Sequence, residues 1–112
     1  MRAKKTAKDL FWEYACNPFF LAKDGLTGTY LALGGGNGEQ ERAWRKEFID
    51  DWISRLSTHD REPLRWLMNA NAVEAIPALL GMENYGDDFM RFWFAYTLEN
   101  LARCGLKQEI RQ

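Results

Sequence analysis

Apolar side chains recur at helical spacing along most of this chain, and the pattern predicts a series of helices. The clearest stretch runs from Glu39 to Ser57. Its large apolar residues follow one another at steps of one, three and four: Trp44, Phe48, Ile49, Trp52, Ile53 and Leu56. Such steps place the side chains in one stripe, which is typical of a helix that lies on a core.

The N-terminal segment predicts one helix that ends before a proline. Thr6 with Asp9 three residues later fits a capping box, so we expect this helix to run from Thr6 to about Cys16. Asn17 precedes Pro18, and a residue before proline avoids the helical conformation. The helix should therefore be interrupted at this point.

Residues 25–38 form the least regular part of the chain, and we expect a glycine-rich connection there. The stretch 29–33 has some strand character, although one short strand cannot make a sheet. The run Gly34–Gly38 before a helix start resembles phosphate-binding loops in outline. It lacks their lysine, and Glu39 and Glu41 would repel a phosphate, so a flexible linker is the favoured interpretation.

Two shorter helices are predicted in the next part of the chain. Pro63 suits the first turn of a helix that ends near Asn69. A second helix is expected over residues 72–80, with Asn71 as its cap and with Pro77 bending it or shortening its first half.

The last predicted helix is unusually rich in apolar residues. It should begin at Asp87 or Asp88 and reach about Cys104, with Gly105 as its terminator. Its large apolar side chains cover more than one face: Phe89, Met90, Phe92, Trp93, Phe94, Tyr96, Leu98 and Leu101. A helix with so wide an apolar girdle is packed on several sides, so we expect it at the centre of the core.

These elements predict one all-α domain over residues 1–112, with about five helices and a flexible basic N-terminus at residues 1–5. The helices would form either compact stacked hairpins or a small helical bundle. The run from Ala75 to Leu80, then Asp88 to Arg91, then Ala95 and Leu98, resembles one HEAT-type repeat. The resemblance implies a proline-containing first helix packed on a second, and stacking with further hairpins.

Composition and charge limit the class of protein. The chain is 46% hydrophobic and 28% charged, which is ordinary for a globular protein and excludes intrinsic disorder. It has no apolar run long enough for a membrane span and no signal-peptide pattern, so we expect a cytoplasmic protein with Cys16 and Cys104 as free thiols. The net charge of -1 argues against binding nucleic acid by bulk charge.

No residue pattern predicts a catalytic, metal or cofactor site. His59, the only histidine, stands beside Asp60 in a predicted turn without a partnered nucleophile, so a capping or exposed role is favoured over acid–base chemistry. Glu47 and Asp51 are one helical turn apart, together with Asp50, but neighbouring basic residues favour a salt-bridged face over a metal site. We therefore expect a protein that is not an enzyme.

The five tryptophans and the clustered arginines point instead to a binding surface. Trp12 and Trp66 sit off the best apolar stripes of their helices, and Arg61 and Arg65 are one turn apart. Aromatic residues beside arginines are common anchors of protein interfaces. We predict an interaction or adaptor module that binds another protein, or a second copy of itself in a homodimer. Alternatives are nucleic-acid binding by the basic arm and arginine helix, or a small ligand in an aromatic pocket.

Overall fold

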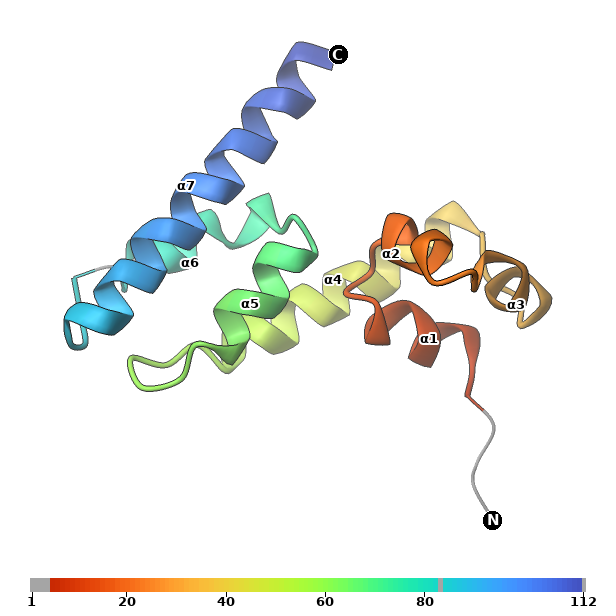
Figure 1. The fold of residues 1–112 in the computed structure, drawn as a ribbon, viewed down its shortest axis with the longest axis horizontal. Coiled ribbons are helices and arrows are strands. Elements are labelled where there is room, and N and C mark those ends of the chain that lie inside the picture. Colours follow the sequence, from red (N-terminus) through yellow and green to blue (C-terminus); the bar gives the residue numbers. More distant parts are fainter. Residues whose placement is uncertain (1–4, 83, 112) are drawn as a thin grey trace. The chain divides into compact units, whose positions relative to one another are not determined.

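The computed structural model describes residues 5–82 and 84–111, and its regular elements in those ranges are all helices (Figure 1). Seven α-helices and one short 3-10 helix are found there, without a strand. The predicted all-α class is confirmed. Of the predicted flexible N-terminus, residues 1–4 lie outside the described residues.

The contacts divide the chain into two compact units, Met1–Phe48 and Ile49–Gln112. Helix α4, Gly38–Ser54, contributes residues to both of them. Each unit has its own set of buried apolar side chains and is described by itself below. The single domain over residues 1–112 stays a prediction.

The first unit contains three short helices and the beginning of α4. They are α1 (Ala7–Glu13), α2 (Pro18–Lys23) and α3 (Thr27–Ala32). Helix α1 begins with the predicted capping box, in which Thr6 and Asp9 each accept a hydrogen bond from the other's backbone N–H. The Asn17 side chain caps α2, and Pro18 occupies the first turn of that helix. The proline thus ends one helix and starts another.

The strand character expected over residues 29–33 is wrong, because this stretch lies mainly in α3. Two glycines with positive φ, Gly25 and Gly34, each stand two residues after the last residue of α2 and α3, respectively. The backbone N–H groups of each glycine and of the residue after it donate the paired hydrogen bonds of a Schellman ending, which closes each helix after less than two turns. Helix α3 therefore lies between Gly25 and Gly34, inside the segment 25–38 that we expected to be an irregular connection.

Tyr30 of α3 anchors the glycine-rich segment to the core of the first unit. Its ring is buried and stacks on Phe11 with 5.8 Å between ring centroids, and Phe11 also contacts Trp44. The Tyr30 hydroxyl donates to Glu41 Oε2 at 2.5 Å. Burial, with a smaller contribution from this hydrogen bond, raises the pKa of Tyr30. A side chain of this chain, rather than a phosphate, thus lies against the glycine run.

The second unit is built around the long helix α7, Asp88–Arg111. This helix contacts α5 (Glu62–Asn69), the 3-10 helix η1 (Val73–Ala75) and α6 (Ile76–Leu80). Pro63 lies in the first turn of α5, as expected. The fully buried side chains of this core come from all of these elements: Leu64, Leu67, Ala75, Leu79, Phe94, Thr97 and Leu101.

The segment predicted as one helix over residues 72–80 is split into η1 and α6. Pro77 stands in the first turn of α6, so the proline shortens the helix as expected. Asn71 does not cap this segment, which corrects the prediction. Its φ is 52°, and the backbone N–H groups of Asn71 and Ala72 bond to carbonyls of α5 in a Schellman ending. Asparagine tolerates this left-handed conformation better than most residues, and it therefore terminates α5.

Gly105 does not terminate α7, contrary to the sequence prediction. The helix continues through this glycine to Arg111. Gly105 lies beside η1, where an added β-carbon would be 3.7 Å from Cγ1 of Val73. The glycine is an interior helical residue with ordinary room for a methyl group.

We predict that Gly105→Ala stabilises the second unit by about 0.5–1 kcal/mol. Alanine loses less backbone entropy than glycine inside a helix, and its methyl group would gain a normal contact with Val73. Chemical denaturation followed by circular dichroism measures the change. A loss of stability would mean that the helix ends at Gly105 after all.

Candidate interaction surface

Helix α7 carries two apolar faces, of which only one belongs to the core. Met90, Phe94, Thr97 and Leu101 recur at steps of four, three and four and are buried against the rest of the second unit. Phe89, Phe92 and Tyr96 point elsewhere and are 57%, 59% and 42% exposed. Helix α7 contacts three other elements of the second unit, but it does not bury all of its large apolar side chains, as the expectation of a helix packed on several sides required. The large apolar side chains of α7 form one buried stripe in the core and one exposed stripe on the outside.

The outer stripe is a connected set of rings, which we name the aromatic face: Phe89, Phe92, Trp93 and Tyr96. Trp93 meets the other three rings edge-on at centroid distances of 5.6 to 6.2 Å. Phe92 and Tyr96 stack at 6.0 Å. Offset and edge-to-face pairs of this kind hold rings in preferred orientations. The face is therefore a partly ordered apolar surface rather than a set of scattered side chains.

Thr97 is the one polar residue of the core stripe named above, and its hydroxyl has no hydrogen-bond partner among the described residues. Burial of an unsatisfied hydroxyl costs free energy. We predict that Thr97→Val, which keeps the shape, raises the free energy of unfolding by about 1 kcal/mol. Thr97→Ser keeps the hydroxyl and loses a methyl group, so it should be destabilising. Denaturant titration of both variants checks this pair, and a destabilised Thr97→Val would show that the hydroxyl is satisfied.

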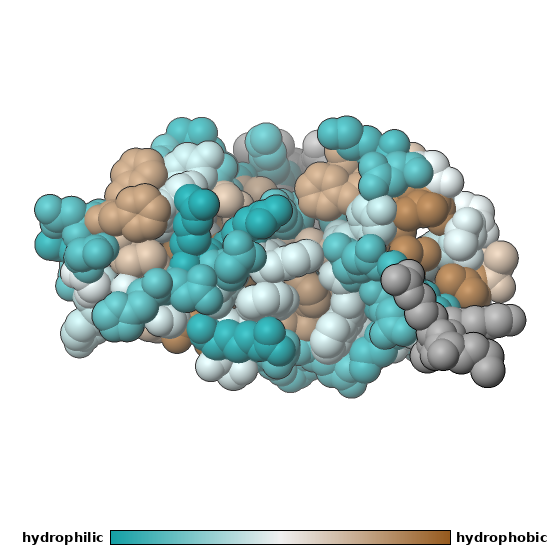
Figure 2. All heavy atoms as spheres, turned by 60° about the horizontal axis from the view of Figure 1, so that its bottom comes forward, coloured by the Kyte–Doolittle hydropathy of each residue, from teal (hydrophilic) through white to brown (hydrophobic). Residues whose placement is uncertain are grey.

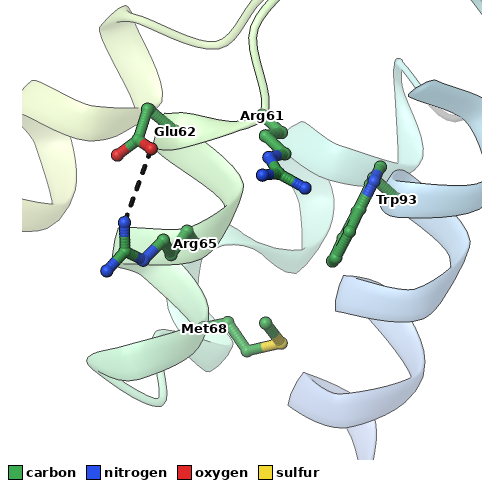
Figure 3. A pocket seen from close by; sticks show the side chains of 5 residues that line it. All are labelled: Arg61, Glu62, Arg65, Met68 and Trp93. Carbon is green, nitrogen blue, oxygen red and sulfur yellow. Dashed lines mark ion pairs between the residues drawn. The ribbon is translucent and has the colours of Figure 1, made fainter. Parts of the chain in front are cut away.

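An open pocket of about 260 Å³ adjoins the aromatic face. Figure 3 shows its lining, with Trp93 on α7 opposite side chains that run from the residue before α5 to near the end of that helix. The lining residues are Arg61, Glu62, Arg65, Met68 and Trp93. Trp93 thus belongs to both the pocket and the aromatic face. The indole Nε1 of Trp93 is buried without a partner among the described residues.

The two pocket arginines are held differently. The guanidinium of Arg61 lies over the Trp93 ring, 5.3 Å from its centroid, and no carboxylate of the described residues pairs with it. Arg65 makes a 3.5 Å ion pair with Glu62, and both side chains are about half exposed or more. The charged lining therefore consists of two cations and one anion, a formal charge of +1.

The structure brings together two of the four residues proposed from the sequence. Arg61 and Arg65 share the pocket. Trp66 is not among the pocket residues and stacks on Trp52 with 5.6 Å between centroids. Trp12 lies in the first unit, where its indole N–H donates to the Trp44 carbonyl at 3.0 Å. Both Trp12 and Trp66 are half-buried and serve the packing of their own units.

Sequence reasoning missed the aromatic face, although the signal was present. Phe89, Phe92, Trp93 and Tyr96 follow one another at steps of three, one and three, which is a helical stripe of its own. The pattern alone could not separate this stripe from the interleaved core stripe. Figure 2 shows apolar side chains, in brown, that reach the surface of the molecule between hydrophilic ones.

The weaker candidates have structural roles. The backbone N–H of His59 donates to Ser57 Oγ, and Asp60 Oδ1 accepts from the backbone N–H of Glu62, so these residues shape a turn. Glu47 pairs with Lys8 at 2.7 Å and Asp51 with Arg55 at 3.0 Å. Across the described ranges, no group of three or more His, Cys, Asp or Glu side chains is placed to hold a metal ion.

The two cysteines are free thiols rather than a disulfide, as expected. Cys16 is buried, and burial raises its pKa to about 12. A thiol with so high a pKa is protonated near neutrality and is a poor nucleophile. Cys16 is therefore a packing residue.

No protein-family model, curated protein or solved structure matches this chain. None of the helices in the described part of the chain has both the length and the apolar character needed to cross a membrane.

Proposed function

We propose that this chain is a protein-interaction module that docks another protein on the aromatic face of α7. The observation that carries the proposal is the exposure of Phe89 and Phe92, each more than half accessible on a helix whose opposite side fills the core. A contiguous exposed apolar patch of this kind is typical of an interaction site. Large aromatic rings are also the side chains that dominate binding energy at interfaces.

The aromatic face meets the physical needs of a docking surface. Its four rings contact one another, so little side-chain entropy is lost when a partner immobilises them. It lies on a helix of 24 residues that packs against three other elements, so the backbone beneath it is supported. The partner that fits is a protein segment with apolar side chains of its own.

Two other functions receive less support. An acidic pair, Asp87 and Asp88, precedes Phe89 directly and is exposed, which is unfavourable for a nucleic-acid backbone. The pocket of about 260 Å³ is smaller than the usual range for small-molecule sites, so a large cofactor or drug-sized ligand is a poor fit for it. We keep the HEAT-like stacking of hairpins as the fold part of this proposal. A cytoplasmic location agrees with the free thiols.

Selection from a peptide display library tests the proposal with a defined probe. Peptides that bind the wild-type chain should lose at least tenfold in affinity for the double variant Phe89→Ala/Phe92→Ala. Phe19→Ala is the matched control, because Phe19 is 68% exposed but belongs to the first unit. The proposal would be contradicted by selected peptides that bind the double variant as tightly as the wild type, or that lose affinity only for Phe19→Ala.

Sedimentation velocity completes this test. A second copy of the chain is a competing occupant of the aromatic face. If the wild-type chain dimerises at micromolar concentration and Phe89→Ala/Phe92→Ala is monomeric, the partner is the chain itself, and docking of another protein is rejected. A monomeric wild type supports the proposal.

A further inference from the structure

We infer that the pocket formed by Arg61, Arg65, Met68 and Trp93 receives a carboxylate of the docked segment, so that the partner peptide carries one acidic side chain beside its apolar ones. The inference rests on the proposed function, because the pocket shares Trp93 with the aromatic face. The inference adds the charge of the partner. It also adds a contact that fixes the position of the partner segment along the aromatic face.

Arg61 is the main argument for an anion. Its guanidinium rests on the Trp93 ring and has no carboxylate partner among the described residues. The contact with the ring holds the planar group at the pocket while leaving its N–H donors for an acceptor. Figure 3 shows the Arg61 side chain directed toward the side of the pocket that Trp93 occupies. A carboxylate is the acceptor that matches a guanidinium in charge and shape.

Charge balance points to a single negative group. Arg61 and Arg65 contribute two positive charges and Glu62 contributes one negative charge. The ion pair between Arg65 and Glu62 is long, at 3.5 Å, and both groups are exposed. Exposed pairs of this kind are weak, so Arg65 can exchange its partner at little cost. One carboxylate would neutralise the lining.

The remaining lining suits the stem of an acidic side chain. Met68 and Trp93 provide apolar walls beside the two guanidinium groups. An aspartate or glutamate could place its methylene groups against these walls and its oxygens toward the arginines. The volume of about 260 Å³ accommodates one side chain of the partner, and its neighbours would lie along the aromatic face.

Nucleic acid could also bring an anion to two arginines, but the surroundings favour a peptide. Arg91 stands within ion-pair distance of Asp88, and Arg103 pairs with Glu99, so these cations of α7 are already balanced. Asp88 is fully exposed at the start of the helix. A continuous phosphate backbone needs a track of positive charge, whereas one carboxylate needs only this pocket.

The test uses peptides selected on the wild-type chain and resynthesised with each Asp or Glu changed to its amide. On the wild-type chain, one such change should weaken binding about 10- to 100-fold, which is the range for hydrogen bonds to charged groups. On Arg61→Gln the same change should have a clearly smaller effect, because the carboxylate has lost one of its two guanidinium partners and only Arg65 remains. Arg55→Gln is the matched control, since Arg55 also lies over a tryptophan, Trp52, but is not a pocket residue.

The outcomes separate this inference from the function on which it rests. Peptides that need Phe89 and Phe92 but respond to neither the amide change nor Arg61→Gln would overturn the inference and leave the docking function intact. Peptides whose affinity is unchanged by Phe89→Ala/Phe92→Ala would contradict both the docking function and this inference. Tighter binding of a single-stranded oligonucleotide than of any acidic peptide, lost in Arg61→Gln, would also overturn the inference in favour of nucleic acid.

Discussion

Phe94→Ala is expected to lower the free energy of unfolding by about 3–5 kcal/mol, whereas Phe92→Ala should change it by less than about 1 kcal/mol. The two phenylalanines are two residues apart on α7 but lie on opposite sides of it. Phe94 is completely buried, so its removal leaves a cavity in the core of the second unit. Phe92 is 59% exposed and would lose only ring contacts with Trp93 and Tyr96.

Denaturant unfolding of both variants measures the difference. The comparison keeps the residue type, the substitution and the helix constant, so it reports burial alone. Equal losses for the two variants would show that the aromatic face is packed inside the folded protein, and the docking surface would not exist. A large loss for Phe94→Ala alone leaves Phe92 without a role in folding.

Gly35→Ala is expected to destabilise the first unit by about 3 kcal/mol. A β-carbon at this position would overlap ring atoms of Tyr30, so either the ring or the backbone must move. Movement of the ring would disturb its stack on Phe11 and its hydrogen bond to Glu41. Overpacking of this kind costs about 1–3 kcal/mol, and the lost hydrogen bond adds to it.

Gly28→Ala is the control for this prediction. Gly28 lies in α3 with nothing within 4 Å of an added β-carbon, so alanine should stabilise the helix by about 0.5–1 kcal/mol. Hydrogen exchange over residues 27–41 reports the local effect of each substitution. Unchanged protection in Gly35→Ala would mean that the glycine run is a flexible linker, as its sequence suggests.

Local signals in the sequence predicted most of the helices. The capping box at Thr6 and the proline in the first turn of α5 depend on neighbouring residues only, and both were found where they were expected. The helix predicted over Glu39–Ser57 is α4, but it ends at Ser54, so Leu56 lies outside it. Two of the misread signals have a common cause. The residues with positive φ just after α1 and α5 are Ala15 and Asn71, where a glycine would have been the usual signal of a helix end.

The surface could be predicted only in part, because its components come from different elements. The spacing of Arg61 and Arg65 placed them on one side of a helix, and the structure puts both in the pocket. Trp93 completes that pocket from α7, about 30 residues later in the chain, and only tertiary packing brings it there. Likewise, the sequence gives α7 two apolar stripes but does not say which one the other helices cover.

The most direct test of the docking surface is ¹⁹F NMR of the chain with fluorinated phenylalanine. The seven phenylalanines include the exposed Phe89 and Phe92 and the buried Phe11 and Phe94. Addition of a selected acidic peptide should shift the resonances of Phe89 and Phe92 and leave that of Phe11 unchanged. Shifts confined to Phe19 and Phe20 of the first unit, with Phe89 and Phe92 unaffected, would contradict the assignment of the aromatic face as the docking surface.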